Sequence, residues 1–218
     1  MPDCRVTKLL RRLCSALLPG LAALVVGCQA LAIPFLMWGP EPTRTVTAEY
    51  PYLKGERIAV AVWADHETIF EFPNVQLELS SFVARAIEQN VKDAKLVHPR
   101  EVLDFQNRNR DWDRLPAARL AERLGASRLI LIELGQYTTR EPGSEHLLRG
   151  HIAAAVRIYS ASAGEGVSPA YRTEVSIAHP PDGPGAWGQS ETVIRRETME
   201  VFAEELARKF YDHKVKVR

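Results

Sequence analysis

The run Asp65-His66-Glu67 is the most concentrated group of side chains that could act as general acids, general bases or metal ligands. Three consecutive residues cannot all point at one site, however, and charged residues in loops are commonly only solvated. The run follows a predicted strand, which is where α/β folds place their ligands. We predict no catalytic or metal-binding role for it.

Four histidines are expected near the same sheet edge if the first and third strands are parallel and the last two follow as a meander. They are His66, His146, His151 and His179. Their spacing matches no metal-ligand motif, and exposed or capping histidines are the commoner explanation. The alternative is a small periplasmic enzyme or metal-binding protein that uses this histidine-bearing edge.

Other chemistries lack their sequence signatures. Cys4, Cys14 and Cys28 are the only cysteines, so no thiol follows residue 28. No phosphate-binding Gly-rich loop, G-x-S-x-G or H-E-x-x-H occurs. The net charge is +1, with basic residues scattered among acidic ones rather than gathered in a stripe. We therefore predict a protein that is not an enzyme and has no cofactor, no metal and no nucleic-acid partner, and we identify no small-molecule substrate.

The first 28 residues have the pattern of a secretion leader. Four basic residues, Arg5, Lys8, Arg11 and Arg12, precede the apolar stretch 13–26. The segment Leu24-Val25-Val26-Gly27-Cys28 resembles a bacterial lipobox, which implies that Cys28 is lipidated and becomes the mature N-terminus. Two or three acyl chains would suffice for stable membrane anchoring.

An uncleaved transmembrane helix over residues 13–38 is the competing interpretation, since a span needs roughly 20 apolar residues. Pro19, Gln29 and Pro34 weigh against it. In both cases the basic residues keep the N-terminus in the cytoplasm, and the rest of the chain lies on the periplasmic side of a bacterial membrane. The chain then divides into a signal peptide (1–27), an anchor and Pro-containing tether (28–56) and a periplasmic α/β domain (57–218).

The domain is expected to be organised around the stretch 129–132. Its uninterrupted apolar residues indicate a strand covered on both faces in the middle of a sheet. The patterns predict strands at 57–63, 95–97, 129–132, 152–158 and 171–177, helices at 75–91, 115–124 and 190–213, and a helical turn at 99–106. Gly125 is expected to end the second helix in a left-handed conformation and Ser190 to cap the third, while the polar stretch 107–113 is expected to be a solvated loop. The buried face of the third helix is expected to carry residues spaced by four, namely Ile194, Thr198, Phe202, Leu206 and Phe210. The predicted class is α+β, an α/β sandwich with helices packed on a mixed sheet of about five strands.

The order strand, helix, strand, helix, strand, strand, strand, helix accompanies two short motifs. These are Leu124-Gly125-Ala126-Ser127 before the third strand and the segment 159–165 at a hairpin. Over residues 57–213 this pattern resembles the α/β domain shared by the amino-terminal part of the TolB translocation protein, the curli-secretion lipoprotein and the lipoproteins that activate penicillin-binding proteins. The resemblance implies a shared fold. It does not imply that this chain has the activity of any one member.

Four bulky apolar residues fall in the loops of the expected edge. Ile69, Phe70, Phe72 and Trp187 could form a partner-binding patch, or their side chains could fold back over the core. The sequence therefore predicts a membrane-anchored, non-enzymatic interaction or assembly module in envelope maintenance or secretion. Its partners would be the membrane, through lipidated Cys28 or one apolar helix, and an unidentified envelope protein.

Overall fold

The computed structural model describes residues 43–144, 146–164, 166–183 and 185–216. Cys28, the signal peptide and the alternative helix 13–38 lie outside these residues. The chain divides into two compact units, and Thr45–His213 forms the one described below. Within the described residues, no helix combines the length and the apolar character that a membrane span requires.

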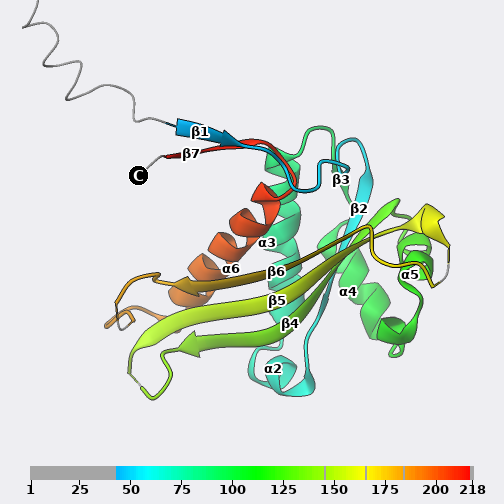
Figure 1. Ribbon diagram of the computed structural model, residues 1–218. Helices are drawn as coiled ribbons and strands as arrows, with labels where there is room; N and C mark the ends of the chain where they lie inside the picture. The colour runs from blue at the N-terminus through cyan, green and yellow to red at the C-terminus, as the bar shows by residue number, and fades with distance from the viewer. Residues whose placement is uncertain (1–42, 145, 165, 184, 217–218) are drawn as a thin grey trace, which may run out of the picture. The chain divides into compact units, whose positions relative to one another are not determined.

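A mixed five-stranded sheet is the centre of this unit, in the order β3-β2-β4-β5-β6. Strand β2 (Arg57–Trp63) runs parallel to the short β3 (Lys95–Leu96) and to β4 (Arg128–Arg140), as Figure 1 shows. Strands β4, β5 (Leu148–Ser160) and β6 (Tyr171–His179) form an antiparallel meander. The predicted α+β class, the mixed sheet of about five strands and the central position of β4 are confirmed.

Two helices cover one face of the sheet. They are α3 (Val75–Asn90) and α6 (Glu191–Arg208), and their apolar residues form one core with inward-facing side chains of β2, β4 and β5. The predicted buried stripe of α6 is confirmed: Ile194, Thr198, Phe202, Leu206 and Phe210 are each at most 2% exposed. The predicted cap is also present, since the Ser190 side chain accepts a hydrogen bond from the Val193 N–H at 3.3 Å.

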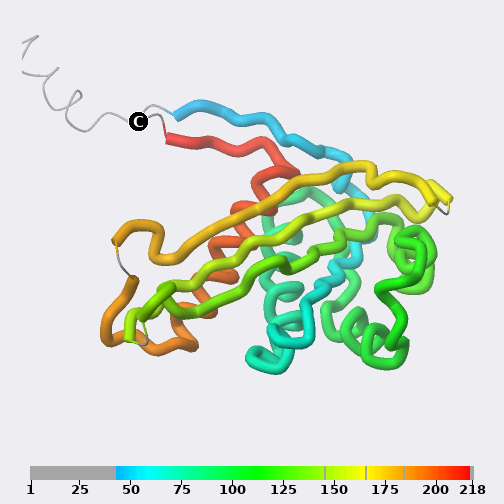
Figure 2. Tube along the Cα trace, turned by 60° about the horizontal axis from the view of Figure 1, so that its bottom comes forward, coloured from blue at the N-terminus to red at the C-terminus, as the bar shows by residue number. Residues whose placement is uncertain are grey.

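The opposite face is covered only near one end of the sheet. Helices α4 (Pro99–Arg108) and α5 (Ala117–Arg123), with the 3-10 turn η1 (Trp112–Arg114), form a second core on Ala59, Ala61 and Leu129. Figure 2 shows the three long strands passing beyond these helices. Gly125 follows α5 at a φ of 62°, the left-handed conformation expected at this helix end.

Strand β4 is longer than predicted, because the sequence indicated only residues 129–132. It pairs with β5 as far as Arg140, with register shifts between Leu134 and Gln136 and between Thr138 and Arg140. Strand β2 ends at Trp63, opposite Glu133. At about 3.3 Å per residue, the β4–β5 hairpin extends roughly 20 Å past β2. The ends of the strands therefore do not meet at one edge.

Three further elements differ from the expectations. Residues 66–71, expected in a loop, form helix α2 (His66–Glu71), which Asp65 caps by accepting from the Thr68 N–H at 2.7 Å. Helix α6 ends at Arg208 rather than near residue 213. Instead, β7 (His213–Lys216) pairs with β1 (Thr43–Val46) in a two-stranded sheet. The core also includes Tyr50 and Leu53, from the stretch assigned to the tether.

Gly150→Ala should destabilise the domain strongly. A methyl group at Gly150 would lie 1.8 Å from Oγ1 and 2.7 Å from Cβ of Thr198, a side chain that is 1% exposed and cannot move aside. Overpacking of this kind costs about 1–3 kcal/mol or more in the free energy of unfolding. Denaturant midpoints measure the loss, with Gly135→Ala as the matched control, because its methyl group would meet only the Ala153 carbonyl oxygen at 3.6 Å. Equal midpoints would contradict the close approach of α6 to β5.

Candidate functional site

Of the four residues predicted to form a partner-binding patch, two are buried or partly buried and two are exposed. Phe72 is 5% exposed and makes an edge contact with Tyr137, with ring centroids 4.7 Å apart, while Ile69 packs partly against the core. Phe70 is 89% exposed and Trp187 is 74% exposed. Phe70 lies in α2, whereas Trp187 follows Ala186, which bridges to Leu148 near the hairpin end. The structure does not bring Phe70 and Trp187 together (Figures 1 and 2).

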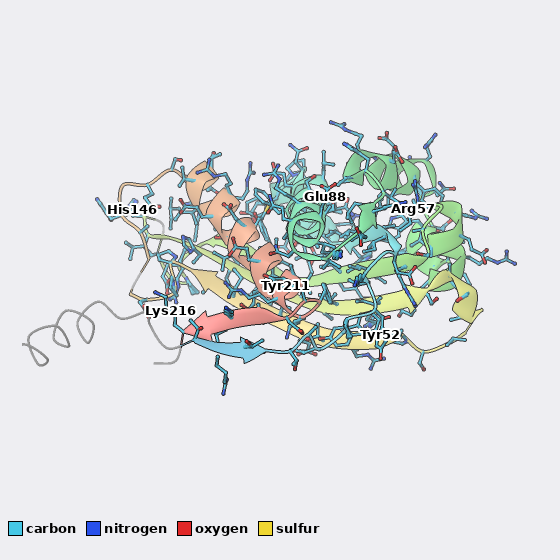
Figure 3. All side chains as sticks on the ribbon, turned by 90° about the horizontal axis from the view of Figure 1, so that it is seen from above. Tyr52, Arg57, Glu88, His146, Tyr211 and Lys216 are labelled. Carbon is cyan, nitrogen blue, oxygen red and sulfur yellow. The ribbon has the colours of Figure 1, made fainter. Side chains whose placement is uncertain are left out.

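The four histidines are also separated. His66 begins α2, while His146 lies in the hairpin loop with its ring 6.0 Å from that of Trp187. Figure 3 places His146 at the opposite end of this unit from Arg57, where β2 begins. His151 and His179 face opposite sides of the sheet: His151 lies beside Ser176, whereas His179 contacts Glu197 of α6. The described residues contain no group of three or more His, Cys, Asp or Glu placed to hold a metal ion.

A hollow that the sequence analysis did not predict lies on the partly covered face of the sheet. Trp63, the last residue of β2, is 37% exposed, and it lines a pocket of about 290 Å³ together with Trp112 of η1. Leu115, Leu120 and Leu131 supply its apolar surface, and Asp113 and Glu133 supply two carboxylates. It lies at the carboxyl end of β2, where α/β folds commonly bind ligands.

Two further pockets share walls with this one. A pocket of about 470 Å³ shares Leu131 and Glu133 and continues along β5 to Arg157 and Tyr159. A pocket of about 310 Å³ shares both tryptophans and reaches the start of α2. We call the three pockets together the open-face groove. The first of them, of about 290 Å³, is called the tryptophan pocket.

The groove exists because the strands are longer than the helices that cover this face. The α4–α5 layer buries Leu129 completely but leaves Leu131 and Glu133 half-buried. Along β5 the same alternation continues: Ile152, Ala154 and Val156 are buried against α3 and α6, while the residues between them are only half-buried. Antiparallel strands commonly keep one face open in this way.

Hydrogen bonds fix the wall that carries Trp63. The Val62 carbonyl oxygen accepts from the Nε2 atoms of Gln76 and Gln106, at 2.8 and 3.1 Å. Strand β3 ends at Leu96, which pairs with Ile58 near the start of β2. On that side of β2, the two side-chain amides therefore bind Val62 in place of a neighbouring strand. Gln106 is 6% exposed, so this clamp is largely shielded from water. The end of β2 is therefore held rigidly, and Trp63 with it.

The charges around the groove are arranged unevenly. On its floor, Arg157 of β5 donates from Nη1 to Glu133 of β4, and both side chains are about one-third exposed. At its α2 end, the backbone N–H of Thr68 donates to Asp65 and lowers the pKa of that carboxyl. Asp113 is exposed and makes no hydrogen bond or ion pair with the described residues. The tryptophan pocket itself is lined by two carboxylates and no basic side chain.

Comparisons with known proteins leave the family open. No family model matches the chain. No curated protein matches it either. The resemblance to the TolB amino-terminal, curli-secretion and penicillin-binding-protein-activator domains therefore stays a prediction.

Several solved structures are similar in part. A PelC dodecamer from Paraburkholderia phytofirmans has a TM-score of 0.45 at 8% identity, covering 78% of this chain and 98% of that one. Lipoprotein GNA1162 from Neisseria meningitidis has a TM-score of 0.39 at 14% identity, covering 56% and 78%. A putative lipoprotein from Caulobacter crescentus has a TM-score of 0.31 at 12% identity, covering 69% and 82%. Lipoproteins are thus among the similar structures.

Ile132→Ala should cost more stability than Leu131→Ala. Ile132 is fully buried, and its truncation should lower the free energy of unfolding by about 2–5 kcal/mol. Leu131 was expected to be covered on both faces, but it lines the pocket and is only half-buried, so less packing is lost there. Denaturant midpoints of the two variants measure the difference. A larger loss at Leu131 would mean that this face is covered after all.

Proposed function

We propose that this chain is a membrane-anchored envelope lipoprotein, lipidated at Cys28, whose folded domain binds a partner protein through the open-face groove without catalysing a reaction. The leader supports the anchor: basic residues, an uncharged apolar stretch and Gly27-Cys28 occur in the order that lipoprotein export requires. The same order favours a periplasmic location for the domain.

The exposed Trp63 above an apolar floor is the observation that carries the binding function. Tryptophan is enriched among the residues that dominate protein–protein binding energy, particularly where it lies beside a pocket that a partner can fill. Here the indole is attached to a clamped strand end, so little backbone freedom would be lost on binding.

The size and lining of the tryptophan pocket favour a protein partner over a substrate. At about 290 Å³ it is at the lower limit of small-molecule pockets and suits one large side chain. Its lining contains no Ser, Thr, Cys, Lys or His, and one of its two carboxylates, Glu133, is engaged by Arg157. These features support a recognition site rather than a catalytic one.

Cys28→Ser should abolish labelling of the chain by a fatty-acid analogue and block cleavage before residue 28. The reason is that the acyl chains require the Cys28 thiol, and serine cannot be lipidated in the same way. Metabolic labelling followed by electrophoresis measures both effects, with Cys14→Ser as the matched control that should behave as wild type. Unchanged processing and labelling of the Cys28 variant would refute the lipid anchor.

A photo-crosslinking amino acid at position 167 of the full chain should capture one specific envelope protein in living cells, because Val167 is 50% exposed and lines the groove outside the tryptophan pocket. The same group at position 187 is the control, because Trp187 is more exposed but lies outside the groove. Adding Leu131→Arg should remove the adduct by filling the pocket with a charged side chain. Equal capture from positions 167 and 187, or capture that survives Leu131→Arg, would contradict a partner site in the groove.

A further inference from the structure

We propose that the tryptophan pocket receives a single cationic side chain, arginine or lysine, from the partner protein. The inference rests on the proposed binding function and adds the chemistry of the group that enters. Its basis is the combination of two indoles, Trp63 and Trp112, with two carboxylates, Asp113 and Glu133, in one pocket lined by no basic residue.

The indoles and the leucines match the two parts of such a side chain. A guanidinium or ammonium group is attracted to the face of an aromatic ring, and tryptophan gives the strongest attraction. The aliphatic stem of arginine or lysine packs well against apolar surface while its charged head reaches polar groups. Leu115, Leu120 and Leu131 supply that surface, and Asp113 and Glu133 line the same pocket.

The charge balance leaves one negative charge for an incoming cation. Glu133 is already paired with Arg157, whereas the exposed Asp113 has no ion-pair partner in the described part of the chain. Arg157 lines the adjoining pocket along β5, and Arg110 lines the one toward α2. The charge of Arg157 is balanced by Glu133, and Arg110 shares its pocket with Asp65, so Asp113 is the carboxylate left to attract a cation, and the site accommodates one basic side chain rather than a basic tract.

An acidic or a neutral group fits less well. A carboxylate or phosphate would approach Asp113 and Glu133 and meet like charge at close range. A neutral aliphatic side chain would gain the apolar contacts but would not use Asp113 or the electrostatic attraction of the indoles. The identity of the inserted group is therefore decided by comparing ligands that differ in charge at similar size.

The test uses the full chain purified in detergent and titrated with N-acetyl-arginine amide, followed by ligand-observed NMR. N-acetyl-norleucine amide is the neutral comparison and N-acetyl-glutamate amide the acidic one. We expect saturable binding of the arginine compound with a Kd of roughly 1–10 mM, and at least about tenfold weaker binding of the other two. Asp113→Asn and Trp63→Leu should each weaken arginine binding several-fold.

Glu174→Gln is the matched control, because Glu174 is an exposed carboxylate on β6 outside the groove and its loss should leave binding unchanged. Absence of saturable arginine binding, equal binding of norleucine, or binding unaffected by Asp113→Asn would overturn the proposal. The partner site itself is tested separately by cross-linking at position 167, which leaves Trp63 in place and captures a partner whatever side chain it inserts. Failure of the cation preference is thus distinguishable from failure of the binding function.

Discussion

The arrangement of β4 is the constraint on which the rest of this domain depends. Its first half is hydrogen-bonded to β2 on one side and β5 on the other. Leu129, Ile130 and Ile132 are fully buried there, but the outer face is already only half-buried at Leu131. Its second half keeps only β5 as a neighbour, and α4 and α5 do not extend over it. A single strand is thus both the centre of the core and the floor of an open surface.

This difference in coverage explains why the groove is both rigid and apolar. The α3–α6 layer holds the inner face of the sheet, and α6 approaches β5 so closely at Gly150 that no larger residue fits beside Thr198. The outer face therefore rests on a sheet that has little freedom to bend. Where the outer helices stop, Leu131 and the indole of Trp63 remain partly in contact with water. Burial of that surface by a partner would release ordered water and favour association.

The sequence predicted those parts of the fold that depend on local pattern. The run 129–132 indicated the central strand, the four-residue spacing from Ile194 to Phe210 indicated the buried helix face, and Gly125 and Ser190 indicated helix ends. It failed for α2, because a six-residue helix begun by one Asp65 cap has too few turns to show an apolar stripe. The predicted range of β4 was also too short, because the polar residues after Leu134 and the register shift there interrupt the alternation of apolar and polar residues.

The candidate site was less accessible to prediction than the fold. Trp63 looked like one face of an alternating strand, and Trp112 lay in a polar stretch that reads as a solvated loop. They share a pocket only because η1 packs against the sheet beside β2, a tertiary contact without a local signal. The four residues chosen as a loop patch were selected by one criterion, a bulky apolar side chain in the loops of one expected edge. That criterion did not distinguish the buried Phe72 from the exposed Phe70.

Thiol labelling of single cysteines on β5 tests most directly whether a partner covers the open face in the envelope. The native cysteines all lie in the first 28 residues, so with Cys4 and Cys14 replaced by serine, Ala155→Cys and Ala154→Cys each introduce one thiol into the domain. Residue 155 faces the open side and residue 154 faces the core. We expect a maleimide to label residue 155 in the purified full chain but not in intact envelopes, and residue 154 in neither. Equal labelling of residue 155 in both preparations would contradict a partner bound on this face.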